Sequence, residues 1–370
     1  MTSRLDRYPL LVLDMHYRTK YHVFIFGLIG IFLFSCVLVS PVHSVPFISK
    51  KKEIEMGRSA DKEVVLQFGI YQDKALQLYI NMIGQRLVSK LTNKEFEKFH
   101  FKLVDSSEIN AFALPGGYIY VTRGLLAALN DESELASVIG HEIAHVTLHH
   151  GAKLMIRSIG AQILSVGGAI ASPKNAGKWL AISTALFQQI NMGYGREAEL
   201  ESDSQGMMNS VEAGYHSFAM VSFLKNLRKQ EVMSGQAYHG FQASHPETKE
   251  RIIKAGTFAS ALSRKHSTPI SNQNTYIQKL KGLVYGGKKY LKDRGRYKSK
   301  HLDIYKVRKG DTLQSISNKL YKDSRHAYEI AVINGIKENV VPNQGVMLKI
   351  IRDGVYIEDK SIYLKPDLVN

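Results

Sequence analysis

The stretch HEIAHVTLHHG, residues 141–151, is the most informative part of this sequence. His141 and His145 are four residues apart, so on a helix both imidazoles lie on one face, about one turn apart. This spacing allows two neutral ring nitrogens to reach one Zn²⁺ at about 2.0–2.1 Å. Glu142 lies beside the same face, where it can take a proton from a metal-activated water and pass it to a leaving amine. Gly140 leaves room for close packing behind the metal.

The residues around this motif predict the helix that carries it. Asp131, with Glu134 three residues later, has the pattern of a capping box, and a glycine closes the quoted stretch. We therefore expect one helix over residues 132–150. His149 and His150 are expected to be C-terminal residues of that helix, favoured by its dipole, and not ligands.

Short strands are expected before the motif helix. Residues 99–104, FHFKLV, alternate like a strand, and Pro-Gly-Gly at 115–117 separates two apolar runs. Residues 112–114 and 118–122 should therefore form a hairpin. The main chain of strand 118–122 would pair with an extended peptide by β-addition. Main-chain pairing does not depend on the side chains of the peptide, so it allows broad specificity. Other segments have helical periodicity: residues 53–91, 158–191 and 196–232.

A third metal ligand is expected in GREAELESDSQG, residues 195–206. A metzincin needs a glycine three residues and a histidine six residues after the second histidine, and this sequence has neither there. A gluzincin takes a glutamate from a later helix, and the segment offers Glu197, Glu199 and Glu201. Glu199 has Asp203 four residues later on the same helical face. Glu199 can then bind the metal while Asp203 accepts a hydrogen bond from a ligand histidine.

H-E-x-x-H followed by E-x-x-x-D resembles the gluzincin family of the CAAX prenyl proteases and HtpX, in its soluble or lipid-anchored periplasmic bacterial branch. The resemblance extends over about residues 50–255. Ser202 stands where the family more often has alanine. Four segments match in order and spacing: NAFALPGGYIYVTRGLL, HEIAH, GYGREAELESD and SHPETKERI.

The resemblance implies a role for each matching residue. His141, His145 and Glu199 would bind one Zn²⁺ per chain, Glu142 would be the general base, and Asp203 would support a ligand histidine.

The resemblance implies roles for three further residues, although less directly. Asn110 would contact the substrate backbone, and Arg251 would be a substrate-site or structural arginine. His245 would be catalytic, facing the metal either to polarise the scissile carbonyl or to plug the site at rest.

The N-terminus has the layout of a secretory signal. Residues 23–39 form an uncharged apolar run after two basic residues, and residues 42–44, Val-His-Ser, have small side chains at the two places that a signal peptidase recognises. We expect residues 1–44 to be removed. A retained anchor and lipidation at Cys36, the single cysteine, are the alternatives, and translation could begin at Met15 instead of Met1.

The C-terminal region, residues 305–351, predicts a β-α-α-β module. Its YKVRKGDTLQSIS resembles the signature of a LysM domain, with Asp311 expected to cap the first helix. The resemblance implies weak binding of N-acetylglucosamine glycans such as peptidoglycan, and the alternative is a small stabilising domain without glycan affinity. The positions expected to line the groove are Gly310, Asp311, Thr312, Asn334 and Gly335.

The formal net charge of +16 is concentrated in one block. Residues 279–309 carry 12 basic and 2 acidic side chains, a net charge of 12 − 2 = +10. The block is either a solvated basic linker or a segment that contacts anionic lipid or envelope glycan, and export argues against nucleic acid as its partner.

These observations predict an α+β protein, with a mainly helical zincin-type domain that includes a small β-sheet or hairpin, and a βααβ module. Its parts are residues 1–44, 45–256 (peptidase), 257–304 (basic connector), 305–351 (module) and 352–370 (tail). The predicted function is a zinc metalloendopeptidase of the periplasm or cell envelope that acts on unfolded or misassembled proteins. The alternative is a non-catalytic peptidoglycan-binding protein with a structural metal site.

Overall fold

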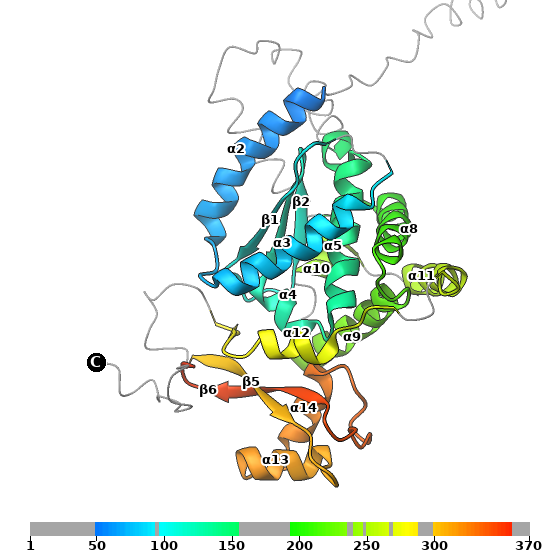
Figure 1. Cartoon of the computed structure of the whole chain (residues 1–370). Helices are drawn as coiled ribbons and strands as arrows, with labels where there is room; N and C mark the ends of the chain where they lie inside the picture. Colours follow the sequence, from blue (N-terminus) through cyan, green and yellow to red (C-terminus); the bar gives the residue numbers. More distant parts are fainter. Residues whose placement is uncertain are drawn as a thin grey trace, which may run out of the picture. The chain divides into compact units, whose positions relative to one another are not determined.

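The computed structural model describes residues 49–92, 96–154, 193–234, 240–246, 249–265, 269–287 and 299–356 (Figure 1). All of them belong to one compact unit, residues 48–370. The signal segment with Cys36, the whole of the predicted helix 158–191 and the centre of the basic block lie outside the described residues. None of the described helices is both long and apolar enough to span a membrane.

A three-stranded sheet lies beside the motif helix. Its strands are β1 (His100–Val104), β2 (Ala111–Leu114) and β3 (Tyr118–Thr122), in the order β1-β3-β2. The predicted hairpin is confirmed, because β2 and β3 are antiparallel. The prediction that a peptide adds to β3 is wrong, since β3 is the central strand and pairs with β1 on its other side. Among the described residues, no strand pairs with the outer edge of β2.

The two faces of the sheet bury alternate side chains, as strand geometry requires. Phe112, Leu114 and Tyr120 pack with helix α2 (Lys50–Phe68), whereas Ile119 belongs to the main core that contains the motif helix. The predicted helix 53–91 is in fact two helices, α2 and α3 (Lys74–Ser89), because Gly69 turns the chain at φ 67°.

The motif helix α5 (Glu132–Thr147) is buried along almost its whole length. Its start is as predicted, with the Asp131 side chain accepting from the Glu134 N–H at 2.8 Å. Its end comes three residues earlier than predicted, since His149 has φ 56°, and a new helical stretch begins at His150.

Further helices surround α5 and supply the remaining site residues. The predicted helical region 196–232 forms α8 and α9. Both pack against α5, and α3 covers another side (Figure 1). The bounds of the other helices are α4 (Arg123–Ala128), α8 (Arg196–Glu212), α9 (Ala219–Ser234), α10 (Phe241–Ser244), α11 (Lys249–Leu262) and α12 (Gln273–Lys279).

The C-terminal region has the predicted element order. Strand β5 (Lys300–Lys306) is followed along the chain by α13 (Leu313–Tyr321), α14 (His326–Ile333) and strand β6 (Met347–Asp353). Strands β5 and β6 are antiparallel, and the short β4 (Val284–Tyr285) pairs with β5. The cap of α13 differs from the prediction, because the Thr312 hydroxyl accepts from Ser315 N–H.

This module contacts the helical domain directly. Lys349 of β6 is buried, and its Nζ donates to the carbonyls of Ala127 and Leu129 at 2.7 Å each. Leu302 and Ile351 belong to the same buried cluster as the core of the helical domain.

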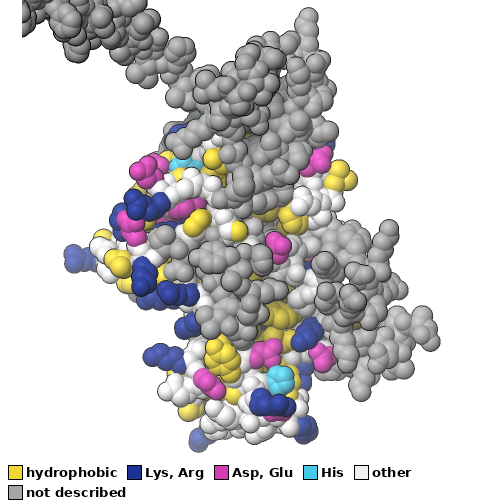
Figure 2. All heavy atoms as spheres, turned by 180° about the vertical axis from the view of Figure 1, so that it is seen from behind, with side chains coloured by type: hydrophobic (Ala, Val, Ile, Leu, Met, Phe, Trp, Pro, Cys, Tyr) yellow, Lys and Arg dark blue, Asp and Glu magenta, His cyan; other side chains and the backbone are white. Residues whose placement is uncertain are grey.

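On the face in Figure 2, basic side chains are interspersed with acidic ones over the described surface.

Candidate metal centre

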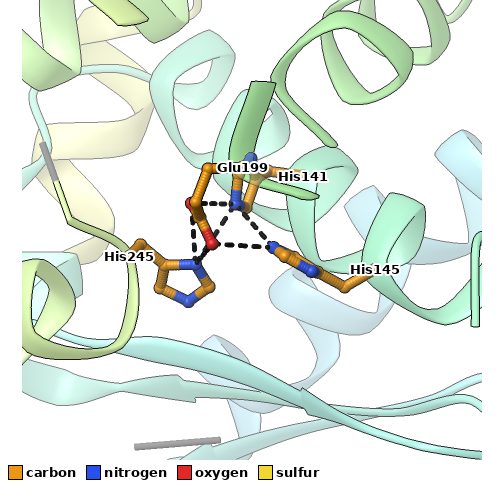
Figure 3. Close-up of side chains that lie close together, drawn as sticks. All are labelled: His141, His145, Glu199 and His245. Atoms are coloured by element: carbon orange, nitrogen blue, oxygen red, sulfur yellow. Dashed lines mark hydrogen bonds and ion pairs between the residues drawn. The ribbon is translucent and has the colours of Figure 1, made fainter. Parts of the chain in front are cut away.

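Four buried side chains direct donor atoms at one point, as Figure 3 shows. His141 and His145 come from α5, Glu199 comes from α8, and His245 follows α10. His141 Nε2 lies 3.0 Å from His145 Nε2 and 3.3 Å from Glu199 Oε2. His245 Nδ1 lies 3.1 Å from Glu199 Oε1 and 3.3 Å from His141 Nε2. The structure thus brings together the three predicted ligands and His245.

These spacings fit a metal ion. Ligands at 2.0–2.1 Å from a tetrahedral Zn²⁺ are separated from one another by about 3.3–3.4 Å. Separations between neighbouring donors lie between 3.0 Å and 3.5 Å, and all four donors lie within 4.8 Å of one another. Three imidazoles and one carboxylate are a donor set that suits Zn²⁺.

Close packing of α5 on α8 places the ligands together. A Cβ on Gly140 would lie 2.8 Å from the Gly206 carbonyl oxygen, and a Cβ on Gly206 would lie 2.6 Å from the His141 nitrogen. Real Cβ atoms essentially never come this close, so both positions need glycine. Gly140 thus allows close packing, as expected from the sequence, and the group packed against it is a second glycine on the facing helix.

Charged groups behind the donors hold them in place. Asp203 Oδ1 lies 2.9 Å from His141 Nδ1, the position expected of a carboxylate that supports a ligand histidine. The guanidinium of Arg251 donates to both Asp203 oxygens at 2.8 Å, and its Nη1 lies 2.9 Å from Glu199 Oε2. Nη1 also donates to the His245 carbonyl. All three guanidinium nitrogens of Arg251 thus have protein partners, which favours the structural role over contact with substrate.

The buried charges shift the pKa values of the cluster in opposite directions. The pKa of Glu199 lies well below its usual value. Burial alone would raise this pKa, but the charge of His245 and hydrogen bonds from the histidines outweigh that effect. Burial places the pKa of His145 well below its usual value, which favours the neutral form that a metal needs. Burial also lowers the pKa of His141, but Asp203 and Glu199 raise it to about 9.

Glu142 lies beside the four donors and is not one of them. Its side chain is fully buried, and its Oε1 lies 3.3 Å from His245 Nε2. Burial raises the pKa of Glu142, partly offset by the charges of His245 and His141. A carboxyl group with a raised pKa is suited to accept and release a proton near neutral pH.

Asn110 lies immediately before β2, and its side chain faces the segment that carries His245. Its Oδ1 accepts from the Ser244 hydroxyl at 3.1 Å, and the Asn110 side chain is buried. It therefore helps to fix the residue before His245, and its contact with substrate stays a prediction.

Three aromatic side chains complete the site and were missed by sequence reasoning. The ring of Tyr194 stacks on His145, with centroids 4.1 Å apart, and Phe241 stacks on His245 at 4.5 Å. His150 Nδ1 lies 2.9 Å from His145 Nδ1. Tyr194 lies five residues before Glu199 and Phe241 lies four before His245, but only the folded chain shows these contacts.

The five positions expected to bind glycan have different surroundings. Gly310, Asp311 and Thr312 lie on the loop before α13 and are exposed or half-buried. The side chain of Asn334 is buried, and its amide bonds to the main chain of Ile330 and Lys349. A Cβ on Gly335 would lie 2.6 Å from the Asn226 side chain of α9, so this position faces the helical domain. The glycan contact stays a prediction.

An H-E-x-x-H helix with a glutamate from a second helix is the donor arrangement of gluzincin metallopeptidases. Comparison with known proteins identifies the family. Residues 74–257 match the model of Peptidase family M48, so the chain carries a domain of this family.

Proteins with similar sequences occur in bacteria and mitochondria. The chain is 29% identical over 253 residues to the beta-barrel assembly-enhancing protease of Escherichia coli (strain K12), covering 65% of this chain and 50% of that one. The protein of the same name in Yersinia pestis is 30% identical over 251 residues, with the same coverage. The mitochondrial metalloendopeptidase OMA1 of Schizosaccharomyces pombe is 25% identical over 266 residues, covering 68% of this chain and 76% of that one. The chain thus spans about half the length of the bacterial relatives.

Proposed function

We propose that this chain is a zinc metalloendopeptidase of the bacterial cell envelope that hydrolyses peptide bonds of unfolded or misassembled envelope proteins. The observation that carries the proposal is the buried cluster of His141, His145, Glu199 and His245, with Glu142 beside it. The membership of residues 74–257 in Peptidase family M48 supports it. So do the names of the relatives, which describe proteases and metalloendopeptidases.

His141, His145 and Glu199 would hold one Zn²⁺. A bound Zn²⁺ supplies Lewis acidity toward the scissile carbonyl and lowers the pKa of a water molecule. Asp203 Oδ1 lies 2.9 Å from His141 Nδ1, so its charge favours a proton on this nitrogen and leaves the other ring nitrogen of His141 to the donor cluster.

Glu142 would move the proton during hydrolysis. Arg251 pairs with the carboxylates of Glu199 and Asp203, whereas Glu142 Oε1 lies 3.3 Å from His245 Nε2. We assign it the transfer of a proton from the attacking water to the amine that leaves.

His245 occupies the position where a catalytic site needs an opening. Catalytic zinc sites have three protein ligands and one open position, whereas His245 Nδ1 lies within 3.3 Å of His141 and Glu199 as a fourth donor. Its Nε2 also lies 3.3 Å from the Ala111 carbonyl of β2. We therefore favour the plug over the carbonyl-polarising role, with the chain around His245 moving aside when substrate binds.

The outer edge of β2 is the place for an extended substrate. Thr122 N–H donates to the Asn110 carbonyl across the hairpin, so by strand alternation the Ala111 and Ala113 carbonyls point outward. These carbonyls are engaged by His245 Nε2 and by the Tyr194 hydroxyl at 3.3 Å and 3.2 Å. Movement of His245 and Tyr194 would free main-chain groups for pairing with a peptide.

Location in the envelope rests on the sequence. A cleaved signal ending at Ser44 would export the chain, and the predicted LysM module would hold it weakly at peptidoglycan. The basic block 279–309 would add contact with anionic lipid or envelope glycan. The alternative, a non-catalytic wall-binding protein, gives no reason for a buried Glu142 beside a metal cluster.

Zinc content and peptide hydrolysis test the proposal together. The purified chain is expected to contain one Zn²⁺ and to cleave casein, to lose cleavage after chelation and to recover it on addition of Zn²⁺. A peptidoglycan pull-down is run beside it. Binding to peptidoglycan with no casein cleavage at full zinc occupancy would favour the alternative.

A further inference from the structure

The two ligand histidines of α5 differ in what holds their outer ring nitrogen. His141 Nδ1 faces the carboxylate of Asp203 at 2.9 Å, which is the usual support for a metal-binding histidine. His145 Nδ1 instead faces Nδ1 of another histidine, His150, at 2.9 Å. Both residues are buried, with exposed fractions of 1% for His145 and 5% for His150.

The proton positions along this contact follow from the ligand role of His145. If Nε2 of His145 binds a metal, its Nδ1 carries the proton and donates. His150 Nδ1 must then accept, which places the His150 proton on Nε2. That nitrogen lies 3.2 Å from Glu201 Oε2, a carboxylate able to accept it. The chain of contacts from Glu201 through His150 to His145 is therefore consistent in donors and acceptors.

Two other side chains fix the same pair of rings. Tyr194 stacks on His145 with an interplanar angle of 25°, which restrains the tilt of that ring. The hydroxyl of Ser202 lies 3.2 Å from His150 Nδ1 and is fully buried. Ser202 is the position where this sequence departs from the alanine of E-x-x-A-D, and the departure supplies a polar group beside His150.

We propose that His150 is a positioning residue for the metal ligand His145: it accepts the Nδ1 proton of His145 and directs the opposite nitrogen toward the metal. The inference rests on the proposed function, because it requires His145 to bind a metal. It replaces the sequence expectation that His150 only ends the motif helix.

Zinc affinity of metal-free protein tests this role without measuring catalysis. The full chain is stripped of metal, and its affinity for Zn²⁺ is measured by competition with a chromophoric chelator. In His150→Phe an aromatic ring remains but the acceptor is lost. In His150→Asn the side-chain oxygen can accept from His145 Nδ1, so this variant should rescue binding. His149→Asn is the matched control, since His149 contacts Glu53 and its φ of 56° suits asparagine.

His150→Phe is expected to bind Zn²⁺ about 10- to 100-fold more weakly than the wild type, as for other groups that support metal-binding histidines. His150→Asn and His149→Asn should remain within a few-fold of the wild type. Wild-type affinity in His150→Phe would overturn the inference, as would equal losses in His150→Phe and His150→Asn, which would indicate packing alone. A wild-type chain that binds no Zn²⁺ would overturn the proposed function, and the inference with it.

Discussion

Replacement of Gly206 by alanine should separate the two helices that supply the metal ligands. The added Cβ would lie 2.6 Å from the His141 nitrogen and 2.8 Å from His141 Cα, where ordinary contacts begin at 3.4 Å. Relief of the closest contact requires a shift of 3.4 − 2.6 = 0.8 Å. Because the atoms that the Cβ would meet belong to the main chain, the helices themselves must move, and Glu199 and Asp203 on α8 would move away from His141.

A shift of this size exceeds the tolerance of a zinc site. Metal–ligand distances vary by about 0.2 Å in good sites, so Gly206→Ala should weaken Zn²⁺ binding by at least about 10-fold. Overpacking of a buried contact should also lower the free energy of unfolding by about 1–3 kcal/mol. Chelator competition measures the first quantity, and urea unfolding of the metal-free protein measures the second.

Gly256→Ala is the control for this prediction. Gly256 lies in α11, and a Cβ there would meet nothing within 4 Å. Alanine in place of a helical glycine should stabilise the chain by about 0.5–1 kcal/mol and leave zinc affinity unchanged. Wild-type zinc affinity and stability in Gly206→Ala would refute the argument that contact between α5 and α8 sets the ligand geometry.

Three further predictions concern the plug, the C-terminal module and the connector. His245→Ala should raise the rate of casein cleavage, since it opens the fourth position; a fall in kcat would instead support carbonyl polarisation by His245. Burial lowers the pKa of Lys349 from 10.5 to about 7, with Glu134 opposing the shift. At this position the folded chain therefore binds fewer protons than the unfolded chain between pH 7 and 10.5, so the contribution of Lys349 to stability should rise with pH across that window. Lys349→Met should abolish this rise in urea unfolding, and a rise of equal size in the variant would contradict the assignment. The last prediction neutralises four basic residues of the connector, Lys288, Lys289, Arg294 and Arg296. Association with the envelope in cell fractionation should weaken, and casein cleavage should stay intact. Lost cleavage would instead place the block in the active domain.

Features of the site that are encoded locally could be predicted from the sequence. The spacing of His141 and His145 places them on one helical face, and Asp131 caps the start of that helix. The four-residue spacing of Glu199 and Asp203 distinguished Glu199 from the neighbouring glutamates. In each case the spacing along one helix determines the geometry, so no long-range contact has to be known.

Features that depend on contacts between distant segments could not be predicted. The position of β3 between β1 and β2 depends on a parallel pairing across the intervening chain. Arg251 meets Asp203 only because α11 packs on α8. The sequence predicts His150 at the end of the motif helix, but the left-handed His149 ends that helix earlier and turns the chain. The folded structure then places His150 behind His145.

Casein cleavage by Glu142→Gln at full zinc occupancy tests the central claim most directly. Glu197→Gln is the matched control, because it makes the same change on an exposed glutamate of α8. If Glu142 transfers the proton, Glu142→Gln should retain one Zn²⁺ per chain and lose at least about 100-fold in kcat, while Glu197→Gln keeps wild-type activity. Cleavage by Glu142→Gln at the wild-type rate would contradict the proposal.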